Sequence, residues 1–195
     1  GYRFASWNDG SKSYTATESI VVEKDMTLTA NWTKLSYNVS FDPNGGTMQT
    51  TAIEKEFGSQ LNLAEFAPVR EAYRLKGWKA GEAEYQPDAV VTVSAAMTFV
   101  AQWTLDVTDA SNFVFDTTGE TAVLTGLSAD CTLETLVVPG EAEGKRVTKI
   151  DRGAFSYNSK IHKVYLDDMT DLVEIGDSAF SGSKNLEFVS LRGHS

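Results

Sequence analysis

The sequence predicts a mainly β protein with a minor helical content, built from two kinds of repeat. Three observations predict this class. The segment MTLTANW, which begins at Met26, returns as MTFVAQW, which begins at Met97. Short runs such as residues 37–41 alternate apolar and polar side chains, which is the period of a half-buried strand. From Val147 onward a different and shorter repeat takes over, in which Ile150 recurs as Ile175.

Composition narrows the classes of partner. Hydrophobic residues make up 42% of the 195 residues, enough to build cores. The net charge of −10 excludes nucleic acid as a partner, because phosphates require a basic surface, and it disfavours adsorption to anionic lipid. No apolar run approaches the roughly 20 residues of a membrane span, so we predict no membrane insertion. The chain starts without methionine and ends inside a pattern, so we expect a piece of a longer protein.

The offset that takes Met26 to Met97 holds without gaps along the first half of the chain. Aromatic residues, which rarely match by chance, coincide in four pairs: Tyr2/Tyr73, Trp7/Trp78, Tyr14/Tyr85 and Trp32/Trp103. We therefore predict one complete module at residues 36–106 and the back half of an earlier module at residues 1–35.

Within the complete module we expect strands near residues 37–41, 50–56, 73–78 and 97–103. Residues 42–46 read Asp-Pro-Asn-Gly-Gly and predict a turn. A short helix fits between residues 63 and 72, broken at Pro68. The recurrence of the tryptophans favours a packed core over a binding surface. The expected core residues are Tyr73, Leu75, Trp78, Phe99 and Trp103.

These motifs resemble the Listeria–Bacteroides repeat, also called the internalin B-repeat. The resemblance rests on FDPNGG, on AYRLKGW beside GYRFASW, and on MTFVAQW. Ala72 and Ser6 stand where the family pattern has glycine. The resemblance implies small β-grasp-like modules strung in tandem on bacterial surface proteins.

The second repeat starts at Val147 and aligns Ile150 with Ile175, Phe155 with Phe180, and Val164 with Val189, a constant offset of 25. An earlier L-x-x-L-x-L frame sets Leu133, Leu136 and Val138 inward. This period is typical of a leucine-rich-repeat solenoid, in which each coil buries its apolar face against the next. The two phenylalanines should stack as a ladder, and Cys131 should be a small buried apolar residue.

The pattern I-x-x-x-A-F…L-x-x-V-x-L resembles the BspA-like leucine-rich repeat of bacterial surface proteins. Residues 112–127 resemble the β-hairpin that caps such arrays at their N-terminal end. We therefore expect a short solenoid domain at residues 107–195, truncated at Ser195.

Catalytic patterns are missing from the sequence. His162 and His194 are interpreted as surface residues, because neither lies in a pattern that would pair it with a nucleophile and a third group. The acidic run Asp167, Asp168, Asp171 lacks the spacing of a calcium loop and is interpreted as a solvated loop. With one cysteine there is no internal disulfide and no thiolate zinc site. The sequence predicts no cofactor, no metal and no enzymatic activity.

One surface is a candidate for binding. Residues between the inward positions of the L-x-x-L-x-L strands face the open side of the sheet, and they favour a protein partner, such as a host or matrix protein. The resemblance implies adhesion by an extracellular protein, secreted or held at the bacterial cell surface. Alternatives are glycan binding through exposed tryptophans and an accessory role in an extracellular hydrolase. The candidate residues are Thr135, Val137, Lys163, Tyr165, Phe188 and Ser190.

Overall fold

The computed structural model describes residues 1–191, so His194 and Ser195 lie outside the described residues. The protein is mainly β, and residues 1–191 contain eighteen strands and two short 3₁₀ turns, η1 and η2. The chain divides into two compact units, one formed by residues 1–70 and 75–103 and the other by residues 71–74 and 104 onward.

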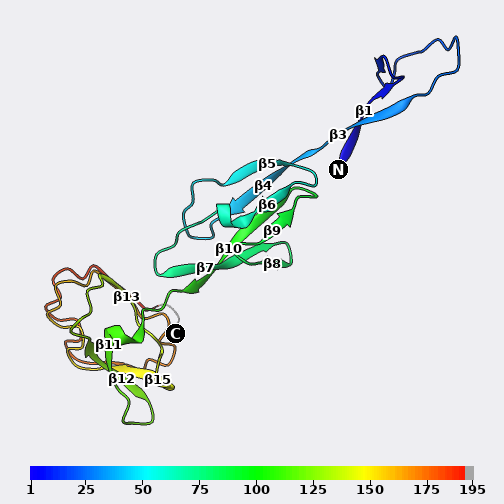
Figure 1. Cartoon of the computed structure of the whole chain (residues 1–195). Coiled ribbons are helices and arrows are strands. Elements are labelled where there is room, and N and C mark those ends of the chain that lie inside the picture. Colours follow the sequence, from blue (N-terminus) through cyan, green and yellow to red (C-terminus); the bar gives the residue numbers. More distant parts are fainter. Residues whose placement is uncertain (192–195) are drawn as a thin grey trace. The chain divides into compact units, whose positions relative to one another are not determined.

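The first unit opens with a three-stranded antiparallel sheet in the order β2-β1-β3 (Figure 1). Its strands are β1 (Tyr2–Asn8), β2 (Ser13–Tyr14) and β3 (Thr29–Lys34). This sheet has little core of its own: Trp7 is 38% exposed and Trp32 is 60% exposed. The prediction that these two tryptophans pack in a core is therefore wrong, because three strands without a covering layer cannot enclose large aromatic rings.

The rest of the first unit is a complete module with a five-stranded sheet in the order β5-β4-β10-β7-β8 and a small two-stranded sheet, β6-β9. Strand β10 runs parallel to β4, whereas β4–β5, β6–β9 and β7–β8 are antiparallel pairs. The elements are β4 (Ser36–Asp42), β5 (Ala52–Glu56), β6 (Gln60–Asn62), η1 (Leu63–Glu65), β7 (Tyr73–Ala80), β8 (Ala83–Tyr85), β9 (Val90–Thr92) and β10 (Met97–Leu105).

An aromatic core fills this module. Trp78 and Phe99 are fully buried, and the Phe41 ring contacts both of them and stacks on Phe66 with centroids 4.0 Å apart. The predicted core residues Leu75 and Trp103 are only half-buried and line its border, and Tyr73 is half-buried but does not pack against this core. The predicted helix is a single 3₁₀ turn, η1, in which Ala64 N donates to the capping Asn62 side chain.

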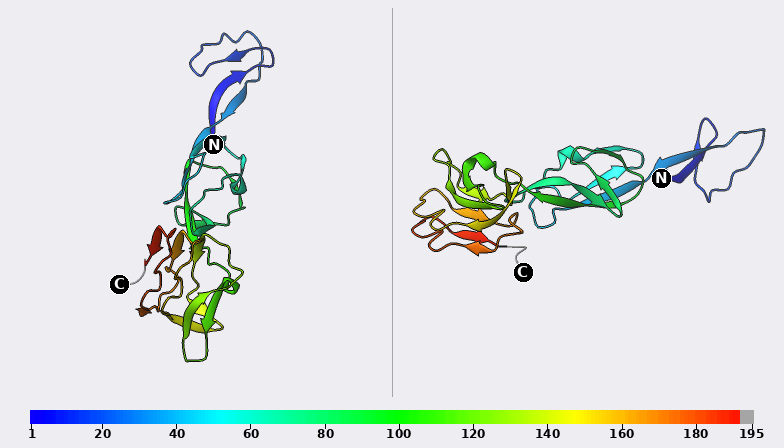
Figure 2. Two further views of the ribbon diagram at one scale, coloured as in Figure 1. Left: turned by 90° about the vertical axis from the view of Figure 1, so that its left-hand side faces the viewer. Right: turned by 90° about the horizontal axis from the view of Figure 1, so that it is seen from below.

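The second unit contains two ladders of parallel strands. In one, β13 (Thr135–Val137), β16 (Lys163–Tyr165) and β18 (Phe188–Ser190) pair in that order; in the other, β12 (Ala122–Leu127), β15 (Lys145–Ile150) and β17 (Glu174–Ile175) do. Figure 2 shows the strands succeeding one another in chain order, from green through orange to red. Strand β11 (Phe113–Asp116) forms the predicted antiparallel hairpin with β12, preceded by η2 (Ala110–Asn112), and β14 (Glu141–Ala142) pairs with β15.

Repeat-to-repeat stacking continues at the turn between the ladders. The Phe155 and Phe180 rings stack with centroids 5.0 Å apart and planes 5° apart, so the predicted ladder is confirmed. The backbones of the two turns are also hydrogen-bonded, because Phe155 N donates to the carbonyl oxygen of Ala179, the residue before Phe180, at 2.7 Å. The core between the ladders includes Leu124, Leu136, Ile150, Ile161, Val164, Leu166 and Met169, with Cys131 buried beside them as predicted.

Leu133, predicted to point inward, and Ile175, the repeat equivalent of the buried Ile150, are not buried. Leu133 and Ile175 are each 41% exposed. Leu133 precedes β13, so the alternation of a strand does not govern its direction, and Cys131 takes the buried position instead. Ile175 lies in β17, which pairs only with β15 in the described part of the chain, so no further strand covers it.

Candidate functional site

The candidate site is the outward side of β13, β16 and β18, which we call the strand face. The register places Thr135, Lys163 and Phe188 in one row and Val137, Tyr165 and Ser190 in the next. The parallel ladder therefore brings all six predicted site residues to one sheet.

Two of the six do not offer an exposed side chain. Val137 is 3% exposed and Ser190 is 4% exposed, which corrects the expectation that both face solvent. Val137 lies on an edge strand covered by the segment around Thr108, whose hydroxyl oxygen accepts from Val137 N at 2.9 Å and whose own N–H donates to Val137 O at 3.0 Å. Ser190 is a short side chain in register with the much larger Tyr165.

The exposed part of the strand face is aromatic. Phe188 is 41% exposed, and its ring lies 5.3 Å from the half-buried Tyr165 ring at an interplanar angle of 50°. Partial burial raises the pKa of the Tyr165 phenol, and the negative charge of Glu71 raises it further. The phenol therefore stays neutral beside an apolar ring and interacts with the Glu71 carboxylate.

An ion pair borders the aromatic pair. Lys163 Nζ lies 2.7 Å and 2.8 Å from the two carboxylate oxygens of Glu71, a residue that belongs to the second unit. This hydrogen bond raises the pKa of Lys163 and holds its charge fixed. Sequence reasoning missed Glu71, because a partner 92 residues away leaves no local pattern.

The tryptophans and His162 provide weaker evidence for a functional site. Trp78 is buried, and Trp103 is half-buried with Nε1 donating to Pro43 O at 3.0 Å, so the complete module offers no open tryptophan platform for a glycan. Trp7 and Trp32, in residues 1–35, are exposed. His162 Nδ1 lies 3.6 Å from a carboxylate oxygen of Glu187 and contacts no nucleophile that the structure records.

The acidic run is used structurally. Asp168 accepts a hydrogen bond from Gly140 N at 2.7 Å, and Asp171 lies 3.6 Å from the guanidinium of Arg146. Within residues 1–191, no group of three or more His, Cys, Asp or Glu is arranged to hold a metal ion.

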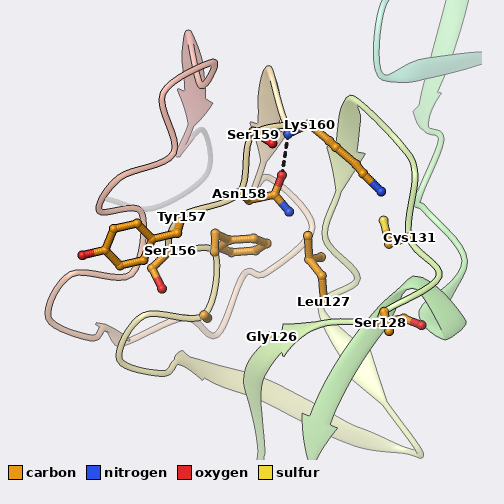
Figure 3. Close-up of a pocket in the computed structure, with 12 residues that line it drawn as sticks. Gly126, Leu127, Ser128, Cys131, Ser156, Tyr157, Asn158, Ser159 and Lys160 are labelled. Atoms are coloured by element: carbon orange, nitrogen blue, oxygen red, sulfur yellow. Dashed lines mark hydrogen bonds between the residues drawn. The ribbon is translucent and has the colours of Figure 1, made fainter.

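A hollow of about 480 Å³ lies beside the first coils of the second unit (Figure 3). Figure 3 shows Asn158 accepting a hydrogen bond from Lys160 N, at 2.8 Å, above Leu127 and Cys131. Its lining provides hydroxyl, amide and ammonium groups but no carboxylate or imidazole side chain. It therefore lacks the usual general base that would activate a hydroxyl or thiol for nucleophilic attack.

Comparison with known protein families gives a match in the first half of the chain. The family model of the Listeria–Bacteroides repeat domain matches residues 1–31 and 37–102, so these two segments carry Listeria–Bacteroides repeats. The match does not reach the second unit.

Two relatives come from Evansella cellulosilytica. One, named as a Gly-rich membrane protein, is 35% identical over 96 residues, and the match covers 48% of this chain and 11% of the relative. The other, named as a membrane protein, is 32% identical over 94 residues, covering 46% of this chain and 13% of the relative. The chain thus spans only about a tenth of the length of these proteins.

Among solved structures, the crystal structure of a leucine-rich-repeat protein from T. pallidum is similar over 46% of this chain and 41% of its own length, with 23% identity and a TM-score of 0.41. A similarity of this size does not establish a shared fold. In the described part of the chain, no helix has both the length and the apolar character needed to span a membrane.

Proposed function

We propose that this chain is a non-enzymatic segment of a bacterial protein, secreted or exposed at the cell surface. In this proposal the internalin-type B-repeats are β-grasp-like spacers. The second unit is a BspA-like leucine-rich-repeat solenoid with a hairpin cap, and its strand face binds another protein in adhesion.

The spacer role is supported by the repeat match and by the form of the complete module. A sheet that encloses Trp78 and Phe99 in a packed core is suited to a rigid unit that repeats along a chain. The names of the two Evansella relatives, both membrane proteins, support a location at the cell envelope.

The solenoid assignment is supported by the equal spacing of the two ladders. Lys163 pairs with Phe188, and Lys149 with Glu174, so both ladders repeat at the period of the sequence. The stacked rings of Phe155 and Phe180 keep the same offset. Each coil then packs mainly on its neighbours, as expected for repeat proteins.

The Tyr165–Phe188 pair is the observation that carries the binding role. A phenol that keeps its proton and an exposed phenyl ring, bordered by the Lys163–Glu71 ion pair, form an apolar centre with a polar rim. Protein interfaces concentrate their binding energy in anchors of this kind, and tyrosine is enriched among them.

Binding of the intact chain to immobilised, purified extracellular-matrix proteins, followed by biolayer interferometry, tests the proposal. We expect Tyr165→Ser and Phe188→Ser each to weaken binding by roughly tenfold or more, the loss of one interface anchor. Tyr157→Ser is the matched control, because Tyr157 is 83% exposed and lies outside the strand face, so its loss should leave affinity unchanged.

Two results would contradict this function. One is that no matrix protein binds the intact chain. The other is that the two strand-face variants, checked for an unchanged thermal transition, bind as tightly as the unmodified chain.

A further inference from the structure

The second unit has a strand edge in the interior of the chain, where its first ladder starts. Strand β13 comes first in the order β13-β16-β18, so it pairs with another strand on one side only. On the paired side, Val138 N donates to Tyr165 O at 2.9 Å. Because the backbone groups of successive residues in a strand point to opposite sides, those of Thr135 and Val137 point to the other edge.

One position of that other edge is closed and the next is open. Thr108 closes the position of Val137, since Thr108 N donates to Val137 O at 3.0 Å and Val137 N donates to the Thr108 hydroxyl oxygen at 2.9 Å. At Thr135, no residue within 1–191 makes a comparable hydrogen bond from outside the ladder. An unpaired N–H and C=O on a sheet edge form a template for an added strand.

A hollow of about 360 Å³ lies beside the open position. Its lining residues all belong to the second unit. Among them, Val107 is 40% exposed and Leu133 is 41% exposed, so the hollow presents apolar surface next to the backbone of Thr135. Its volume falls within the roughly 300–1,000 Å³ of ligand pockets.

The wall of the hollow around Val107 is held in place by hydrogen bonds on both sides. Asp106 N donates to Ala72 O at 2.9 Å, and the Asp109 carboxylate accepts from Ser111 N at 2.9 Å. The bonds between Thr108 and β13 fix the centre of the same segment. A segment ordered before binding reduces the entropic cost of taking up a ligand.

The charge of the hollow is negative. Asp106 and Asp109 line it and are exposed, and its lining among the described residues contains no lysine or arginine. Cationic side chains therefore complement this site, and anionic ones are repelled.

We propose that this edge of β13 binds an extended segment of another protein in which basic and apolar side chains alternate. The segment adds a strand to the sheet, with its backbone accepting from Thr135 N and donating to Thr135 O. Its apolar side chains pack on Val107 and Leu133, and its lysine or arginine side chains reach Asp106. Successive side chains of an extended chain point to opposite sides, so an alternating sequence fits a lining of both kinds.

This inference concerns the edge of the sheet and not its outward side. It uses the backbone of Thr135, so it does not depend on the binding role of the strand face. The two proposals fail separately, because the strand face is tested with matrix proteins and the edge with a short peptide.

The probe is a synthetic peptide, acetylated and amidated, with the sequence Lys-Val-Lys-Val-Lys-Val, titrated into the full chain. We expect saturable changes in the amide NMR signals of Thr135 and of the residues around Val107. The Thr135 amide should exchange with deuterium at least roughly tenfold more slowly with the peptide bound, because it gains a hydrogen-bond acceptor.

Two altered peptides separate strand addition from attraction between charges. Replacing the central valine with proline keeps the charge of the peptide but removes a backbone N–H, so affinity should fall roughly tenfold or more. Replacing every lysine with glutamate should abolish binding, because the carboxylates would face Asp106 and Asp109.

Protein variants with matched controls locate the site. Asp106→Lys should weaken binding roughly tenfold or more, whereas Glu120→Lys, the same change in net charge at an exposed position in the turn between β11 and β12, should leave it unchanged. Leu133→Ser should weaken binding by a similar factor. Val114→Ser is its control, because Val114 is 48% exposed on β11 and does not line the hollow.

Three results would overturn the proposal. One is binding without protection of the Thr135 amide. The second is an equal loss of affinity in Asp106→Lys and Glu120→Lys, which would assign the binding to net charge alone. The third is a chain that sediments as a dimer with the Thr135 amide already protected, which would make a second copy the occupant of the edge.

Discussion

Replacing Ala72 with glycine should stabilise the complete module, residues 36–106. Ala72 has φ of +64°, in the left-handed region where a Cβ approaches the following carbonyl oxygen. An L residue held there costs roughly 1–2 kcal/mol. In residues 1–35, the position equivalent to Ala72 is Gly1, the glycine of the family pattern.

The net gain is smaller than this penalty. Glycine gives up more backbone freedom on folding, at a cost of roughly 0.5–1 kcal/mol relative to alanine. The two effects leave a stabilisation of about 0.5–1 kcal/mol for Ala72→Gly. In a module of this size, that corresponds to a rise of about 2–8 °C in the midpoint of thermal unfolding.

The assay is urea unfolding followed by indole emission, since the fully buried Trp78 reports the loss of the module core. Ala95→Gly is the control: Ala95 is exposed and is not among the positive-φ residues of the described chain, so its replacement has only the entropic cost. The two variants should differ by roughly 1–2 kcal/mol in the free energy of unfolding. Equal destabilisation by both would refute the claim that Ala72 is strained.

Two further predictions concern the stacked Phe155 ring in the second unit and the Asp9–Tyr14 hydrogen bond in residues 1–35. Phe155→Ala should destabilise the second unit by roughly 3–5 kcal/mol in chemical denaturation, because Phe155 is 1% exposed; a loss below about 1 kcal/mol would show that the site collapses around the gap. The pKa of Asp9 is lowered to about 2, chiefly by the hydrogen bond from the Tyr14 hydroxyl. This bond therefore contributes fully above the ordinary pKa of 3.8 and is lost as the pH falls through about 2. In an NMR titration, Tyr14→Phe should move the Asp9 midpoint up towards its ordinary value, and an unmoved midpoint would contradict this cause.

Strands and side-chain contacts that recur with the repeats could be predicted from the sequence. The longer offset aligns β1 with β7, and the shorter one aligns β16 with β18, because residues with the same role recur at a fixed distance. The stacking of Phe155 on Phe180 follows from the same reasoning, since neighbouring coils place equivalent side chains in contact.

Contacts between residues that do not share a repeat position could not be predicted from the sequence. Val137 follows the alternation of its strand yet is buried, because Thr108, from a segment before the repeats, covers the edge. Trp32 matches Trp103 in sequence yet is exposed, because the strand that would enclose it is not in the same half-module. Glu71 forms an ion pair with Lys163, which is 92 residues away in the sequence, and no sequence pattern predicts this contact.

The pairing of β4 with β10 has a mechanical consequence. The module begins with β4 and ends with β10, and these two strands are parallel neighbours with Val39 beside Met97 and Asp42 beside Val100. A pull on the two ends of the module drags the strands along each other in opposite directions. The hydrogen bonds between them then bear the load together and do not open one after another. Such a module should yield abruptly and only at high force.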